Sequence, residues 1–161
     1  MNIIVVVDEN WNIGRDGGLL VHLPGDLKYF KEKTLGKTVV VGRKTLESFP
    51  GSKPLPGRRN IVLTRKERYK PEGCETCASK EELTRLLGND TKDVFICGGQ
   101  NVYGQFLEEC DRYFVTKIYA AFDADRSFPE LDSRQDLEIV WKSDTQEENG
   151  INYQFFEYKR K

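Results

Sequence analysis

Short runs of aliphatic residues recur along the whole chain, and most of them are followed by a helical pattern. Residues 3–7, 38–41, 60–64, 93–97 and 113–119 are such runs, and each has the length of one strand. A strand that is apolar throughout is typical of a parallel sheet, because helices cover both faces of such a sheet. The alternation of apolar runs and helical patterns therefore predicts an α/β fold.

Proline, glycine and capping residues mark the ends of the expected helices. Pro24 opens a helix that runs to about residue 34, and Gly36 lies beyond its end. Ser79 is followed three positions later by Glu82, which is the pattern of a capping box, and Gly88 closes that helix. We therefore expect two separate helices, one from Pro24 to about residue 34 and one between Ser79 and Gly88.

The last part of the chain predicts a terminal hairpin. Residues 137–142 and 152–158 are its expected strands, with Asn149 and Gly150 in the turn. We therefore expect an antiparallel edge on an otherwise parallel sheet. No repeat, low-complexity tract or linker divides the sequence, so residues 1–161 are expected to form a single domain.

Charge and the amino-terminal sequence exclude several classes of partner. Lys and Arg number 25 and Asp and Glu number 26, so the chain lacks the basic field that binds nucleic acid through its phosphates. The apolar run at the amino terminus has no basic residues before it and turns acidic at Asp8, which predicts neither a signal peptide nor a membrane span. A cytoplasmic protein is expected.

Cys74 and Cys77 form a C-x-x-C pattern, which can indicate zinc or redox chemistry. The only histidine, His22, is far away in the sequence, and no second cysteine pair completes a set of four ligands. If the segment is extended, the two thiols lie on opposite faces of the strand. We expect reduced thiols without a function, and no metal site.

Two strand-to-helix junctions carry glycine where a phosphate could approach the backbone. They span residues 39–45, with Gly42, and residues 94–101, with Gly98 and Gly99. Amide groups and the positive end of the helix dipole favour an anion at such a position. Each junction alone is more often a tight turn, but the two together indicate a dinucleotide.

Basic residues follow the same strand ends. Arg43 and Lys44 lie at the first junction, and Thr64 and Arg65 follow the third strand. These groups suit an additional phosphate monoester, whereas neither G-x-G-x-x-G nor an acidic residue for a ribose hydroxyl is evident, which favours NADP over NAD. The alternative is that each is a solvated surface cation.

Asp26 falls in the first turn of the helix that Pro24 opens, next to the apolar residues Leu27 and Phe30. An aspartate here is often only a favourable charge at the helix dipole. The functional alternative is a lone carboxylate that faces a pocket and pairs with the N–H edge of a planar heterocycle.

Taken together, these segments resemble the dihydrofolate reductase family. The matching stretches occur in the family's order and cover nearly the whole chain; they are residues 13–14, 23–27, 42–45, 54–58, 60–64, 98–103, 115–116 and 128–129. The length resembles that of the bacterial enzyme that stands alone. The resemblance implies an eight-stranded, mostly parallel twisted sheet with flanking helices. It also implies NADPH-dependent reduction of 7,8-dihydrofolate, with hydride transfer to C6 and protonation of N5.

The resemblance also assigns roles to individual residues. Asp26 and Thr116 would be catalytic. Dihydrofolate and antifolate inhibitors would bind Ile4, Val5, Val6, Leu27, Phe30, Phe49, Leu55, Arg58 and Cys97. NADPH would bind Val6, Ile13, Gly42, Arg43, Lys44, Thr45, Thr64, Arg65, Gly98, Gly99, Gln100, Asn101, Val102 and Tyr103. A lid over residues 10–21 would be supported by Gly14, Asp16, Leu19 and Asp125, and the protein would be a monomer.

The sequence departs from the family pattern in two places. Leu20, Val21 and His22 stand where the family usually has proline, tryptophan and one further residue, so the indole that anchors an ordered water is missing. His22 could replace a proton donor or be a surface residue. Gln100 replaces the third glycine of the usual run.

Two other functions would fit parts of these observations. The related pyrimidine reductase of riboflavin synthesis shares the fold and cofactor but would not need Asp26 in the pocket or Arg58 for a glutamate tail. A catalytically idle NADP-binding module would bind the cofactor without turnover.

Overall fold

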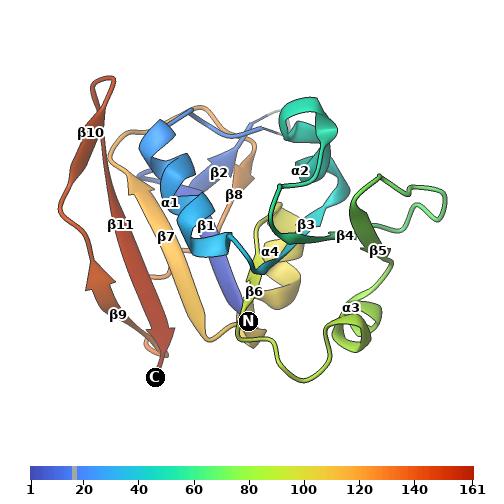
Figure 1. Ribbon diagram of the computed structural model, residues 1–161. Helices are drawn as coiled ribbons and strands as arrows, with labels where there is room; N and C mark the ends of the chain where they lie inside the picture. The colour runs from blue at the N-terminus through green and yellow to red at the C-terminus, as the bar shows by residue number, and fades with distance from the viewer. Residues whose placement is uncertain (16–17) are drawn as a thin grey trace.

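The computed structural model describes residues 1–15 and 18–161 (Figure 1). The strands of its main sheet are β1 (Asn2–Val7), β3 (Thr38–Gly42), β4 (Arg59–Leu63), β5 (Cys74–Cys77), β6 (Val94–Ile96), β7 (Arg112–Ile118), β9 (Leu137–Lys142), β10 (Gln146–Glu148) and β11 (Ile151–Arg160). Their order is β10-β11-β7-β1-β6-β3-β4-β5, with β9 also paired to β11. The pairs from β7 to β5 are parallel, and β11 is antiparallel to its neighbours. The predicted α/β class is therefore confirmed.

The helices that begin at Pro24 and after Ser79 have bounds close to the predicted ones, and two others follow the glycine junctions. They are α1 (Pro24–Thr34), α2 (Arg43–Ser48), α3 (Lys80–Leu87) and α4 (Gln100–Phe106), with short 3-10 turns at Pro50–Ser52 and Leu107–Glu109. Ser79 caps α3, because its hydroxyl accepts a hydrogen bond from the backbone N–H of Glu82 at 3.1 Å. None of the helices in the described part of the chain combines the length and apolar character that crossing a membrane requires.

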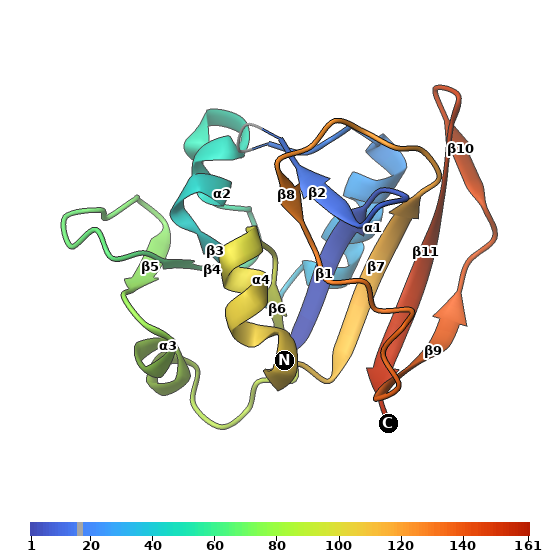
Figure 2. The same cartoon turned by 180° about the vertical axis from the view of Figure 1, so that it is seen from behind.

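Helices cover both faces of the sheet, with α1 on one face and α4 on the other (Figures 1 and 2). The side chains of β1 alternate accordingly. Ile3, Val5 and Val7 belong to the core cluster that contains residues of α4, whereas Ile4 packs in a second cluster with Phe30 of α1. The apolar run of β1 is continuous because both of its faces are buried.

The strands of the expected hairpin pair differently from the prediction. Asn149 and Gly150 do form a turn, but it joins β10 to β11, and the predicted strand at residues 137–142 is β9, which pairs farther along β11. Since β9 and β10 share one edge of β11, the main sheet has nine strands in the described ranges, where eight were expected. A separate ribbon of β2 (Asn12–Gly14) and β8 (Arg126–Ser127) also forms, and neither strand was predicted from the sequence.

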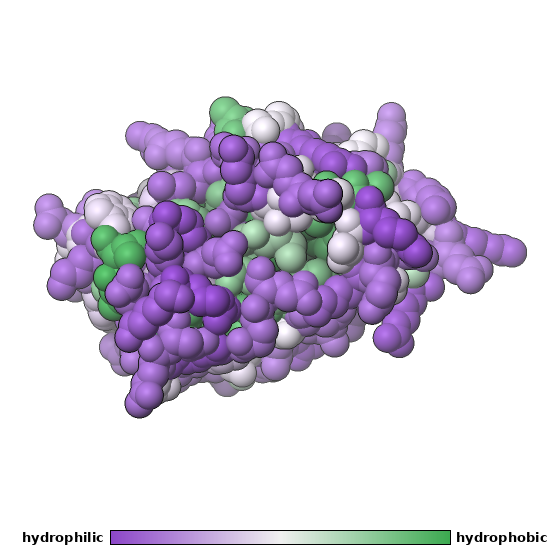
Figure 3. All heavy atoms as spheres, turned by 90° about the horizontal axis from the view of Figure 1, so that it is seen from below, coloured by the Kyte–Doolittle hydropathy of each residue, from purple (hydrophilic) through white to green (hydrophobic). Residues whose placement is uncertain are grey.

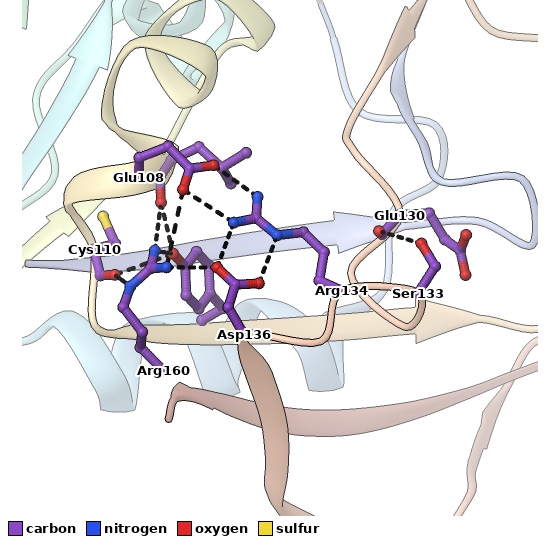
Figure 4. Close-up of polar contacts among 9 residues, drawn as sticks. Glu108, Cys110, Glu130, Ser133, Arg134, Asp136 and Arg160 are labelled. Atoms are coloured by element: carbon purple, nitrogen blue, oxygen red, sulfur yellow. Dashed lines mark hydrogen bonds and ion pairs between the residues drawn. The ribbon is translucent and has the colours of Figure 1, made fainter.

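The carboxyl end of β11 is fastened to the rest of the molecule by arginines (Figure 4). Arg160 donates to the carbonyl oxygens of Cys110 and Leu107 and to Asp136, and Arg134 forms paired bonds to Asp136 and Glu108. This cluster lies at the amino ends of the parallel strands. Figure 3 shows that hydrophilic side chains dominate the face of the molecule at that end, with hydrophobic residues in small patches.

Candidate active site

The buried carboxylate of Asp26 is the centre of the site. Pro24 starts α1, so Asp26 falls in its first turn, and the side chain of Thr116 on β7 donates a hydrogen bond to its Oδ1 at 2.6 Å. Asp26 is only 7% exposed. Loss of water around the carboxylate raises its pKa from 3.8 to about 6; the bond from Thr116 opposes this shift, and the charge of Glu148 adds to it. Asp26 can therefore change its protonation near neutral pH.

Asp26 opens into a small apolar pocket between α1, the ends of β1 and β7, and the segment that leads to α1. The pocket is lined by Val6, Ile13, Leu19, Leu20, Val21, Leu23, Asp26, Leu27 and Ile118. The predicted residues Val6, Ile13, Leu19 and Leu27 are thus brought together with Asp26. A carboxylate in such a wall is suited to pair with a polar edge of an otherwise apolar, planar ligand.

The segment that departs from the family pattern packs against this pocket. Val21 lies beside Leu23, Ile118 and Tyr153 in one hydrophobic cluster. An aliphatic side chain here packs but donates no hydrogen bond. His22 is exposed, so the structure turns it toward solvent ahead of α1.

Other predicted pterin contacts divide between the two faces of the sheet. Ile4, Phe30, Leu55 and Cys97 share one cluster on the face of α1. The side chain of Val5 packs in the core on the opposite face, so the structure does not bring it to Asp26.

The backbone of two predicted pterin contacts, Ile4 and Cys97, is hydrogen-bonded to other parts of the protein. The carbonyl of Ile4 accepts a hydrogen bond from the Tyr103 hydroxyl at 2.7 Å. Cys97 donates its N–H to Val40 at 2.9 Å, and burial raises the pKa of its thiol. The tyrosine contact connects the predicted nicotinamide and pterin regions.

The two glycine junctions lie side by side. β3 and β6 are paired neighbours, and the N–H of Gly42 donates to the carbonyl of Gly98 at 2.8 Å. A Cβ at Gly42 would lie 3.2 Å from Val102, and one at Gly99 would lie 3.2 Å from the hydroxyl of Thr45. Glycine is favoured at both positions because a side chain there would press on these neighbours. The predicted pyrophosphate contacts at both strand ends therefore form one surface.

The predicted phosphate-binding cations lie beyond the ends of β3 and β4. Gly42 pairs with Leu63, so Arg43 and Thr64 continue from neighbouring strand ends. Arg43 forms an ion pair with Glu47 at 2.7 Å, one helical turn away. Lys44, Arg65, Gln100 and Asn101 are exposed.

The residues predicted to hold the benzoylglutamate part approach from the loop before β4. Arg58 donates to the hydroxyl of Thr34 at 3.1 Å and to the carbonyl of Pro56 at 3.0 Å, which fixes its guanidinium at the end of α1. Leu55 packs with Phe30, whereas Phe49 packs in a different cluster with Leu46.

The predicted lid is anchored at its base by a residue that the sequence analysis missed. Asp8 is 2% exposed, and its carboxylate accepts hydrogen bonds from the backbone N–H groups of Asn10, Asn12 and Phe122 at 2.8, 2.9 and 3.0 Å. An aspartate that directly follows a buried strand often accepts a hydrogen bond from the backbone N–H two positions on, and that signal could have identified it.

Two contacts join the chain farther along the predicted lid to the segment after β7. The backbone N–H of Asp125 donates to the carbonyl of Gly14 at 3.0 Å, and Arg15 forms an ion pair with Asp123 at 2.8 Å. Leu19 is 61% exposed. Asp16 lies outside the described residues.

The four cysteines are unpaired thiols. Cys74 is half-buried and Cys77 is buried on β5. Within residues 1–15 and 18–161, no group of His, Cys, Asp and Glu side chains is arranged to hold a metal ion.

Comparisons with known proteins agree with this geometry. A family model described as dihydrofolate reductase matches residues 1–160. The chain is 35% identical over 162 residues to the dihydrofolate reductase of Bacillus subtilis (100% of this chain, 95% of the relative) and 37% identical over 158 residues to that of Neisseria gonorrhoeae (98% and 96%). A solved structure of dihydrofolate reductase from Enterococcus faecalis, complexed with NADP(H) and RAB-propyl, is 35% identical, with a TM-score of 0.87 over 99% of this chain and 95% of that chain.

Proposed function

This chain belongs to the dihydrofolate reductase family and is an NADPH-dependent oxidoreductase, and we propose that it reduces 7,8-dihydrofolate to 5,6,7,8-tetrahydrofolate through Asp26. The observation that carries the proposal is the carboxylate of Asp26, buried at the wall of an apolar pocket and bonded to Thr116. A pterin is planar and apolar on its faces, and it has a polar edge with N–H groups, so it fits such a wall.

In the proposed reaction, Asp26 accepts hydrogen bonds from the 2-amino group and N3 of the pterin. Thr116 holds one carboxylate oxygen in place, which orients the other toward the ligand. The negative charge on this edge favours the ligand with a proton on N5. Because the surroundings of Asp26 are apolar, this electrostatic effect is stronger than it would be in water.

The reaction adds a hydride to C6 and a proton to N5 across one double bond. When bound, NADPH supplies the hydride. The close glycine junctions of β3 and β6 support its binding, since they leave backbone without side chains beside Thr45 and Val102. We propose that Gly42, Gly98 and Gly99 hold the pyrophosphate and that Arg43, Thr64 and Arg65 hold the 2′-phosphate.

The other predicted contacts complete the proposed substrate site. Arg58 binds the α-carboxylate of the glutamate tail, because its planar guanidinium forms two parallel bonds to a carboxylate. Its bond to Thr34 orients it for this role. Leu55 and Phe30 pack against the ring between the pterin and this tail.

The proposal is tested by following oxidation of NADPH with dihydrofolate added to the purified protein. Turnover that depends on dihydrofolate is expected, and small diaminopyrimidine antifolates should inhibit it. Turnover with a pyrimidinone ribose phosphate in place of dihydrofolate would instead support the riboflavin-type reductase, and cofactor binding without turnover would support an idle NADP-binding module.

A further inference from the structure

The hairpin of β10 and β11 reaches the first turn of α1 through Glu148. Its Oε1 accepts a hydrogen bond from the backbone N–H of Gly25 at 2.7 Å, and the hydroxyl of Tyr153 donates to the same oxygen. Glu148 is 123 positions from Gly25 in the sequence, yet Gly25 directly precedes Asp26. A strand at the far end of the chain thus contacts the residue next to the active-site carboxylate.

This contact caps the start of α1, which has no capping side chain of its own. The residue before α1 is Leu23, which has no side-chain oxygen to cap the helix, and Pro24 has no N–H group. The N–H of Gly25 is therefore the first amide donor of α1, and donors at a helix start need partners from outside the helix. Glu148 is that partner, and its negative charge is favourable at this end of the helix dipole.

The identity of residue 25 fits the same contact. A methyl group at Gly25 would collide with Oε1 of Glu148 and with the hydroxyl of Tyr153. Glycine lets the carboxylate lie directly against the helix backbone.

Glu148 also places a second negative charge close enough to Asp26 to raise the pKa of Asp26 further. The other ionisable groups that interact with Asp26 are Tyr29 on α1, Tyr103 on α4 and Tyr153 on β11. Burial raises the pKa of each of these tyrosines, so they are neutral when Asp26 ionises. His22, ahead of α1, is exposed. Within the described ranges, Glu148 is thus the neighbouring carboxylate that acts on Asp26.

We propose that Glu148 is a positioning residue for the reaction: it holds the first turn of α1 through Gly25 and places its negative charge close to Asp26. This inference rests on the proposed function, in which Asp26 binds the pterin. Its two parts can be separated, because glutamine keeps the accepting oxygen and removes the charge.

The test compares Glu148→Gln with Glu147→Gln. Glu147 is the preceding residue on β10, and its carboxylate accepts from the N–H of Gly150 instead, so the control removes the same charge from the same strand. The first measurement is the titration of the Asp26 carboxyl carbon by NMR in the free protein. The pKa of Asp26 should fall by about half a unit in Glu148→Gln and stay unchanged in Glu147→Gln. An unchanged pKa in Glu148→Gln would overturn the inference.

The second measurement is the rate of hydride transfer against pH. The midpoint of this pH profile should move to lower pH in Glu148→Gln and stay unchanged in Glu147→Gln. If the pKa of Asp26 shifts in Glu148→Gln but the midpoint of the rate profile does not, the inference would also be overturned. If the parent protein failed to reduce dihydrofolate, the proposed function would be wrong, but the NMR titration would still measure the coupling.

A third variant tests the contact with the helix. Glu148→Ala removes the acceptor for Gly25 and should raise the KM for dihydrofolate several-fold, whereas Glu148→Gln should keep a KM close to that of the parent. Equal KM values in the parent, Glu148→Gln and Glu148→Ala proteins would contradict the positioning role. The Gln variant keeps the charge test available even if the Ala variant folds poorly.

Discussion

The burial of Asp26 makes the stability of the folded protein depend on pH. Its pKa is about 6 in the folded protein, against 3.8 for an exposed carboxyl, mainly because it is buried. The folded state therefore holds this proton more tightly than the unfolded state does. The stabilising effect is complete below the unfolded pKa and is lost as pH rises through about 6.

Asp26→Asn should thus make the protein more stable in alkaline solution. We expect the free energy of unfolding to rise by about 1–3 kcal/mol at about pH 8, with little change at about pH 4. Urea unfolding at both pH values measures this. An equal effect at the two pH values would show that the carboxylate is not destabilised by burial.

Arg43 and Arg65 should set the preference for NADPH over NADH. Each charge-assisted bond to a phosphate contributes about 1.5–3 kcal/mol, so the double Ala variant should raise the KM for NADPH by about ten-fold or more and leave the KM for NADH nearly unchanged. Arg68→Ala, in the same exposed loop, is the matched control. A similar loss with both cofactors would contradict the assigned contact.

Residue identity alone predicted part of the site. Pro24 and the residues around it placed Asp26 correctly in a first helical turn, because proline fixes a helix start locally. Glu148 could not be found this way, since its contact with Gly25 depends on how the sheet orders β11, β7 and β1.

At the scale of elements, the lid and its ribbon depend on pairing between distant short segments. β2 and β8 have three and two residues, too few to show a strand pattern in the sequence. Their pairing and the bond from Asp125 to Gly14 place the start of the lid against the segment after β7. The sequence analysis therefore did not predict this ribbon.

Asp125→Ala should slow hydride transfer while leaving the fold intact. The side chain is expected to support the lid in its closed position, and loops of this kind often control the step that they cover. Single-turnover rates would be compared with those of Asp144→Ala, an exposed aspartate in the loop between β9 and β10. An unchanged hydride step in Asp125→Ala would remove the lid contact from the mechanism.

At the scale of the whole molecule, the two apolar clusters described above lie on opposite faces of one sheet, and a single domain remains the prediction. The arginine cluster of Figure 4 joins the last strand to the turn after α4. The bonds from Arg134 and Arg160 hold the pKa of Asp136 at about 2, so this exposed cluster keeps its ion pairs until strong acid.

Arg160→Ala should destabilise the whole molecule, because it leaves the carbonyls of Cys110 and Leu107 without this donor. We expect a loss of about 1–3 kcal/mol in the free energy of unfolding, with Lys159→Ala as the exposed control. Circular dichroism and tryptophan fluorescence should report the same urea midpoint in each protein, since one domain and a monomer are predicted. Separate midpoints would contradict a single domain.

The central claim is that Asp26 promotes reduction of dihydrofolate by pairing with its pterin edge. The measurement that tests it most directly is the stopped-flow rate of hydride transfer from NADPH to dihydrofolate, compared across pH for the parent and Asp26→Asn. We predict that Asp26→Asn is slower by about ten-fold or more at neutral pH and recovers part of its rate in acid, where the substrate is protonated without help. An Asp26→Asn rate equal to that of the parent at neutral pH would contradict the account.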